Sequence, residues 1–156
     1  EHRLADALQG ARGHYDFVLI DCPPSLGLLT VNGLVAADRA LVPLQCEFYA
    51  LEGLSQLVRT INVVKQNFNP NLAIQGIVLT MYDSRNKLSD MVSRDVRDYF
   101  GDVVYETVIP RNVRISEAPS FGKPVLMYDI KSTGAQAYAA LAAEILNQEK
   151  QLASAS

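Results

Sequence analysis

The chain has 156 residues, of which 49% are hydrophobic and 20% are charged, and its formal net charge is -3. This length and apolar content suit one α/β domain with a sizeable core over residues 1–156. A net negative charge provides no overall basic field, so any contact with nucleic acid requires a local basic patch. No apolar run reaches membrane-spanning length, and Cys22 and Cys46 lack metal-ligand spacing. We therefore expect a cytoplasmic protein with free thiols and no membrane association.

The first predicted elements are a helix and a buried strand. Apolar residues at helical spacing predict a helix from His2 to Ala11. The continuous apolar run from Phe17 to Ile20 is typical of a strand buried on both faces of a parallel sheet. Pro23 and Pro24 withdraw two backbone donors, so this strand ends at Asp21. Ligands of open α/β sheets bind at such strand ends, although an aspartate there can also simply cap the next turn.

The rest of the chain alternates between predicted helices and predicted strands. We expect Ser25 to cap the first of these helices. The predicted helices cover Leu28 to Ala37, Leu51 to Phe68, Leu88 to Phe100 and Thr133 to Leu152, and the predicted strands cover Ala40 to Gln45, Leu72 to Thr80, Val103 to Ile109 and Val125 to Tyr128. This alternation predicts a mostly parallel, doubly wound α/β sheet with right-handed crossovers.

Four longer motifs resemble the ParA/Soj partition ATPases, relatives of MinD with a deviant Walker A loop. They are Asp21-Cys-Pro-Pro-Ser-Leu-Gly27, Cys46-Glu-Phe-Tyr-Ala-Leu-Glu-Gly-Leu54, Ile109-Pro-Arg-Asn-Val-Arg114 and Glu117-Ala-Pro-Ser-Phe-Gly-Lys-Pro124. The resemblance implies a P-loop NTPase-like fold. The family's Gly-rich, two-lysine Walker A loop does not occur in this sequence. We therefore interpret the chain as the carboxyl-terminal portion of such an ATPase, without the first strand and the P-loop.

The resemblance assigns a role to the residues that follow the first predicted strand. Asp21 corresponds to the Walker B aspartate, which holds Mg²⁺ through a water molecule beside the phosphates of ATP. The switch that senses the γ-phosphate corresponds to Pro23, Pro24, Ser25 and Gly27. Both roles depend on a phosphate-binding loop, so we expect the 156-residue chain alone to be inactive as an ATPase.

The resemblance also implies an adenine site in two loops that follow later strands. One loop contains Met81, and the other contains Pro110, Arg111 and Asn112. Apolar Met and Pro side chains can cover the faces of the base, while an amide and backbone groups can read its polar edge. A strand-ending proline beside a solvated arginine is the simpler explanation of Pro-Arg alone, but the longer motif favours the adenine site.

Arg85 and Arg114 lie in the same two predicted loop regions. The resemblance implies that they bind DNA phosphates without sequence preference, in an ATP-dependent homodimer that works with a ParB-like activator near the nucleoid. Two other classes of function stay open. Asp21 and Lys123 could belong to a phosphorylation-receiver module, although no acidic pair precedes Asp21. The chain could also be a non-enzymatic module that retains only a dimer or DNA surface.

Overall fold

The structure, a computed structural model, describes residues 2–11, 13–23 and 25–155. None of the described helices is long and apolar enough to cross a membrane. The chain divides into two compact units, Glu1–Leu41 with Leu51–Gln75 and Val42–Ala50 with Gly76–Ser156. In chain order the elements are α1 (Arg3–Leu8), α2 (Leu28–Ala36), β1 (Arg39–Gln45), α3 (Ala50–Asn67), β2 (Ala73–Tyr82), α4 (Lys87–Phe100), the 3₁₀ helix η1 (Gly101–Val103), β3 (Val104–Pro110), α5 (Val113–Glu117), the 3₁₀ helix η2 (Ala118–Phe121), α6 (Val125–Tyr128) and α7 (Thr133–Ala155).

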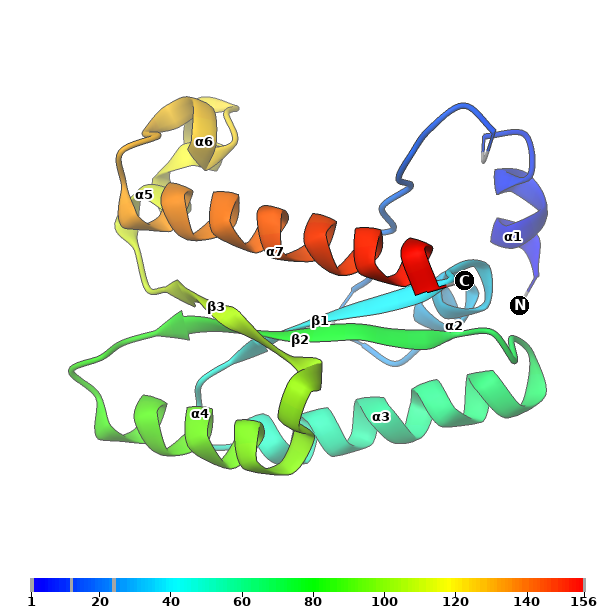
Figure 1. The fold of residues 1–156 in the computed structure, drawn as a ribbon, viewed down its shortest axis with the longest axis horizontal. Coiled ribbons are helices and arrows are strands. Elements are labelled where there is room, and N and C mark those ends of the chain that lie inside the picture. Colours follow the sequence, from blue (N-terminus) through cyan, green and yellow to red (C-terminus); the bar gives the residue numbers. More distant parts are fainter. Residues whose placement is uncertain (1, 12, 24, 156) are drawn as a thin grey trace. The chain divides into compact units, whose positions relative to one another are not determined.

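The described strands form a three-stranded sheet in the order β1-β2-β3 (Figure 1). β2 and β3 are parallel, with Tyr82 opposite Pro110 at their carboxyl ends. Ile77, Val78 and Leu79 of β2 are all buried, as expected for a central strand covered on both faces. Pro43 lies in β1 at the edge of the described sheet, where the missing N–H of proline is tolerated. These features confirm the predicted parallel α/β fold.

The core of the first unit lies between α2 and α3. Its buried members are Leu34, Val35, Ile61, Val64 and Leu72. The side-chain amide of Asn69 lies 2.7 Å from the carbonyl oxygen of Ala37 and 3.1 Å from that of Leu34. Because the last carbonyls of a helix have no partner within the helix, this amide stabilises the end of α2. The loop after α3 is thereby fastened to α2.

In the second unit, helices cover both sides of β3. Figure 1 shows α4 and α7 on opposite sides of this strand. On the α7 side the buried core consists of Val78, Tyr105, Ile109 and Leu141. The carboxylate of Glu144 in α7 accepts hydrogen bonds from the backbone N–H groups of Glu106 at 2.7 Å and Thr107 at 3.0 Å. Glu144 thus satisfies backbone donors of β3 that would otherwise be available to another strand.

The predicted strand from Phe17 to Ile20 is absent. The segment has no regular secondary structure, and the side chain of Leu19 is 91% exposed. A strand needs a neighbour for its backbone N–H and C=O groups, and none of β1, β2 and β3 pairs with this segment. The prediction of a buried strand is therefore wrong for this structure: Phe17, Val18 and Leu19 are exposed, and the described residues provide no pairing partner.

Two smaller predictions also differ from the structure. The segment predicted as a last strand is the short helix α6, in which the carbonyl of Pro124 accepts hydrogen bonds from the N–H groups of Met127 and Tyr128 at 2.9 and 3.0 Å. Pro124 is the N-cap of this turn, so these local hydrogen bonds outweigh the apolar composition of the segment. The N-cap of α2 is Gly27 rather than the predicted Ser25, which lies two residues earlier.

Candidate functional site

The carboxyl ends of β2 and β3 lie side by side. Tyr82 pairs with Pro110, and the N–H of Arg111 donates to the carbonyl of Tyr82 at 2.9 Å. This hydrogen bond continues the parallel ladder beyond the end of β3. Met81 precedes Tyr82 in the chain, and Asn112 follows Arg111. The structure therefore brings the residues of the predicted adenine site to one edge of the sheet.

Met81 has an unusual backbone conformation. Its φ is 53°, and it is the one non-glycine residue with positive φ among the described residues. Such a conformation costs a side-chain-bearing residue about 1–2 kcal/mol, so the surrounding structure must impose it. The hydrogen bonds that the carbonyls of Thr80 and Tyr82 accept from Cys46 and Arg111 fix the backbone on either side. Strained residues of this kind concentrate at ligand sites, and the Met81 side chain is 38% exposed.

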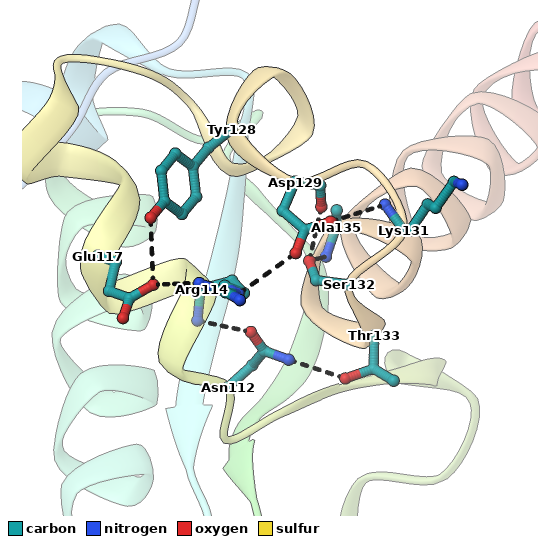
Figure 2. A network of polar contacts seen from close by, with 9 residues as sticks. All are labelled: Asn112, Arg114, Glu117, Tyr128, Asp129, Lys131, Ser132, Thr133 and Ala135. Carbon is teal, nitrogen blue, oxygen red and sulfur yellow. Dashed lines mark hydrogen bonds and ion pairs between the residues drawn. The ribbon is translucent and has the colours of Figure 1, made fainter.

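Asn112 fixes the shape of the loop that follows β3. Its side-chain oxygen accepts a hydrogen bond from the N–H of Arg114 at 2.9 Å and so caps α5. Its side-chain nitrogen donates to the hydroxyl of Thr133, the first residue of α7, at 2.8 Å (Figure 2). Both ends of the Asn112 amide are therefore engaged within the protein.

Arg114 joins two segments that are distant in the sequence. Its guanidinium lies 2.9 Å from Glu117 in α5 and 3.3 Å from Asp129, which follows α6 (Figure 2). The hydroxyl of Tyr128 donates to the same Glu117 oxygen at 3.2 Å. The hydrogen bond to Glu117 is the main reason why the pKa of Arg114 is raised above its ordinary value. Arg114 is thus part of an ordered network.

Arg85 makes a more local ion pair. Its guanidinium donates to both carboxylate oxygens of Asp83, at 3.0 and 2.9 Å, and its backbone N–H also donates to Asp83 at 3.0 Å. The hydrogen bonds from Arg85 lower the pKa of Asp83 to about 2. The Arg85 side chain remains 86% exposed. Both arginines predicted to bind DNA are therefore paired with carboxylates, but Arg85 is the more accessible of the two.

The segment around Asp21 belongs to the first unit and is supported by α2. Asp21 itself is exposed. A Cβ atom at Gly33 of α2 would lie 2.8 Å from the sulfur of Cys22, so a larger residue at this position would require the Cys22 side chain to shift. Burial, followed by the charge of Asp21, raises the pKa of the Cys22 thiol. The side chain of Cys22, which is next to Asp21 in the chain, thus packs closely against Gly33 of α2.

A threonine holds the predicted switch segment. The hydroxyl of the buried residue Thr30 donates to the carbonyl of Ser25 at 2.5 Å and lies 3.4 Å from that of Pro23. Gly27 begins α2 immediately afterwards, with extended backbone geometry. The fourth predicted switch residue, Pro24, lies outside the described residues. Side-chain bonding by Thr30 thus fastens the turn to the helix that follows it.

The residues near Asp21 fit a magnesium ion held through water. In the part of the chain that the structure describes, no group of three or more His, Cys, Asp or Glu side chains is placed to hold a metal ion. Mg²⁺ commonly binds through one or two carboxylates together with water and substrate phosphates. A single exposed carboxylate at Asp21 matches that kind of site.

Sequence reasoning missed several residues that support these sites. Thr30 and Gly33 support the Asp21 segment, and Thr133 supports the loop after β3. Gly134 is a fourth, because a Cβ atom there would lie 2.7 Å from Ile115 and 3.1 Å from the side chain of Asn112. A helical pattern treats glycine and threonine as weak helix formers, so only spatial proximity identifies their roles.

The parallel sheet, the helices on both sides of β3 and a strained residue at the strand ends define an α/β protein with a P-loop NTPase-like fold. A solved cobyrinic acid a,c-diamide synthase from Mycobacterium smegmatis with bound ADP and magnesium matches at a TM-score of 0.77 and 42% identity, over 96% of this chain and 54% of that one. The cell division ATPase MinD of Pyrococcus furiosus matches at a TM-score of 0.77 and 29% identity, over 94% of this chain and 58% of that one.

Sequence comparison identifies relatives within this class of α/β proteins. A family described as "AAA domain" matches residues 1–74. The chromosome partitioning protein ParA of Caulobacter vibrioides is 64% identical over 151 residues, which are 96% of this chain and 57% of that protein. The sporulation initiation inhibitor protein Soj of Bacillus subtilis is 54% identical over 145 residues, 93% of this chain and 57% of that protein. The chain belongs to the ParA/Soj family of chromosome-partitioning ATPases and spans somewhat more than half the length of these relatives.

Proposed function

We propose that this chain provides the base-binding, magnesium-binding and DNA-binding residues of an ATP-dependent partition switch. The observation that carries the proposal is the joined end of β2 and β3, where strained Met81 lies beside Pro110 and Arg111 through the hydrogen bond between Arg111 and Tyr82. This edge combines an exposed thioether and a proline ring with the backbone of the loop after β3, which suits a flat heteroaromatic base. The position at the carboxyl ends of parallel strands is where ligands of this fold class bind.

Asp21 supplies the magnesium-binding part of the same function. Its carboxylate is exposed, and the contacts of Gly33 and Thr30 hold the residues that follow it against α2. Asp21 would hold the ion through water, and the ion would supply neutralisation of the phosphate charge during ATP hydrolysis. The turn from Pro23 to Gly27 responds to the γ-phosphate. The solved relative that contains ADP and magnesium supports this assignment.

Arg85 and Arg114 supply the contacts to DNA phosphates. The chain has a net charge of -3, so binding depends on local cations rather than on a general positive field. Guanidinium groups match phosphate oxygens in geometry and charge. In an ATP-dependent homodimer each arginine occurs twice, which doubles the number of phosphate contacts. A ParB-like activator completes the proposed cycle.

Titration calorimetry with Mg-ATP tests the nucleotide part of the proposal. We expect the 156-residue chain alone to bind more weakly than micromolar, because it has no phosphate-binding loop. The same chain joined to the amino-terminal portion of the Caulobacter vibrioides relative, called the extended chain below, is expected to bind at micromolar concentration or better. Failure of the extended chain to bind ATP would refute the proposed function.

A methionine pair tests the base site itself. Met81→Ala in the extended chain removes apolar surface from the proposed base face, so ATP binding should weaken about threefold to tenfold. Met91→Ala is the matched control, because Met91 is another exposed methionine and belongs to α4 rather than to a strand. Equal affinities of the two variants would place the base elsewhere.

A further inference from the structure

The loop that carries the proposed base-binding residues is attached to the start of α7 by a polar network (Figure 2). Arg114 is the centre of the first attachment. Its guanidinium contacts Glu117 within α5 and Asp129 before α7, at 2.9 and 3.3 Å. Because Glu117 and Asp129 belong to different segments, the arginine charge joins the two segments and offsets the repulsion between the two carboxylates.

The second attachment lies two residues earlier in the loop. Asn112 donates to Thr133 at 2.8 Å, while its oxygen caps the N–H of Arg114 at 2.9 Å. The close approach of Ile115 and Asn112 to Gly134 shows that this loop also packs tightly against the first turn of α7. The loop from Asn112 to Glu117 is therefore held at both ends. The hydrogen bond to Thr133 holds Asn112, and the ion pairs of Arg114 hold Glu117.

The α7 side of the network is itself well ordered. Asp129 accepts a hydrogen bond from the N–H of Lys131 at 3.2 Å, and the hydroxyl of Ser132 accepts one from the N–H of Ala135 at 3.2 Å (Figure 2). Ser132 also donates to the carbonyl of Asp129 at 2.8 Å. The carboxylate that contacts Arg114 is thus fixed by the turn that begins α7, so it can serve as a rigid anchor.

We propose that Arg114 is a positioning residue for the base-binding loop, and that it acts by holding Glu117 of that loop to Asp129 at the start of α7. Arg111 and Asn112 lie three and two residues before Arg114, so loss of the anchor frees the backbone groups that read the base. This role rests on the proposed function, since it presupposes that the loop binds the base. It also separates Arg114 from Arg85, whose ion pair with Asp83 stays within one loop.

Hydrogen exchange on the 156-residue chain tests the anchor without any nucleotide. Asp129→Asn removes the charge that attracts Arg114 but keeps the side-chain oxygen that accepts from Lys131. We expect backbone amides in residues 111–117 to exchange about twofold to fivefold faster, as suits the loss of one exposed ion pair. Asp102→Asn is the matched control, because Asp102 is an exposed carboxylate in η1. Equal exchange in the two variants would refute the anchor.

Nucleotide selectivity of the extended chain tests the positioning role. ATP and GTP differ only in the base, so the ratio of their affinities reports base recognition and is insensitive to the phosphates. We expect Arg114→Ala to reduce a wild-type preference for ATP about threefold to tenfold, and Asp129→Asn and Thr133→Val to reduce it less. Arg114→Lys should restore part of the preference, because lysine keeps the charge but not the planar fork.

The outcomes separate this inference from the proposed function. If the wild-type extended chain shows no preference for ATP over GTP, the base site is refuted and the positioning role with it. If wild type prefers ATP and the preference is unchanged in Arg114→Ala and Asp129→Asn, only the positioning role is refuted. A reduced preference in these variants, with an unchanged preference in Asp102→Asn, supports both.

Discussion

The segment around Asp21 and the loops after β2 and β3 are supported in different ways. The loops after β2 and β3 extend from paired strands, and the hydrogen bond from Arg111 to Tyr82 joins their backbones directly. The Asp21 segment follows an apolar run that pairs with none of the described strands. Contacts with Gly33 and Thr30 of α2 support it instead.

This difference shows that a strand-end site needs two separate contributions. The sequence of the strand provides the apolar side chains, and a neighbouring strand provides partners for the backbone. β2 has both, since Ile77 and Leu79 are fully buried and the strand is paired on each side. The run from Phe17 to Ile20 has apolar side chains but no neighbouring strand among β1, β2 and β3. The four predictions below test this comparison from the largest expected effect to the smallest.

The largest effect is expected at the arginines of the better-supported loops. Arg85→Ala combined with Arg114→Ala in the extended chain should abolish ATP-dependent DNA binding while dimerisation at saturating ATP persists. If a dimer loses about four phosphate contacts, the slope of log affinity against log salt falls by up to about 3.6, and affinity at about 0.1 M salt falls on the order of a thousandfold. Mobility shifts at several salt concentrations measure both quantities.

Arg59→Ala provides the control for this experiment. Arg59 is also an exposed arginine, but it belongs to α3 and not to the loops after β2 and β3. Wild-type affinity and slope in the double variant would mean that Arg85 and Arg114 do not contact DNA phosphates. Equal losses in the double variant and in Arg59→Ala would point to a general charge effect instead.

A pair of leucines tests the comparison through stability. Leu72 is completely buried in the first unit, so Leu72→Ala should lower the free energy of unfolding by about 2–5 kcal/mol. Leu19 is 91% exposed, so Leu19→Ala in the 156-residue chain should change it by no more than about 0.5 kcal/mol. Denaturant titration of both variants measures the difference.

The same leucine pair sharpens the comparison in the extended chain. If the added residues supply a strand that pairs with the run from Phe17 to Ile20, Leu19→Ala should lower the free energy of unfolding nearly as much as Leu72→Ala does. A small effect of Leu19→Ala in both chains would show that this run never becomes a buried strand.

Asp21→Ala tests the magnesium role of the less supported segment. Loss of the carboxylate should lower the Mg²⁺-dependent ATPase rate of the extended chain about tenfold to a hundredfold, with a smaller loss of ATP affinity. Asp16→Ala is the matched control, since Asp16 is an exposed aspartate in the same part of the chain. Unchanged turnover in Asp21→Ala would return Asp21 to the role of a turn cap.

The smallest effect concerns the ion pair between Asp83 and Arg85. The pKa of Asp83 is lowered to about 2, below the value of about 3.9 for a free aspartate. A lowered pKa in the folded state means that this pair contributes stability above about pH 4, and that the contribution is lost as the pH falls towards 2. Carboxyl NMR titration should therefore give a midpoint near 2 in wild type and a higher one in Arg85→Ala. An unchanged midpoint would show that Arg85 does not hold Asp83.

Much of the fold could be predicted from residue patterns. Helical periodicity predicted α3, observed over Ala50–Asn67, and α4, observed over Lys87–Phe100, within a few residues. The buried apolar pattern predicted β2 and β3 equally well. These elements have a long, regular pattern, so their local preference and their tertiary environment agree. The segment Val125–Tyr128 is too short for a pattern to decide, and its preceding proline made it a helix.

The sequence by itself determined the long helices, the strands β2 and β3 and the residue types at their ends, because these follow from local periodicity and chain breaks. Tertiary structure alone decided which of these residues meet. The positive φ of Met81, the anchoring of Arg114 by Asp129 and the close approach of Cys22 to Gly33 all depend on segments separated in the chain. The run from Phe17 to Ile20 shows the same limit, since a strand exists only where a second strand satisfies its hydrogen bonds.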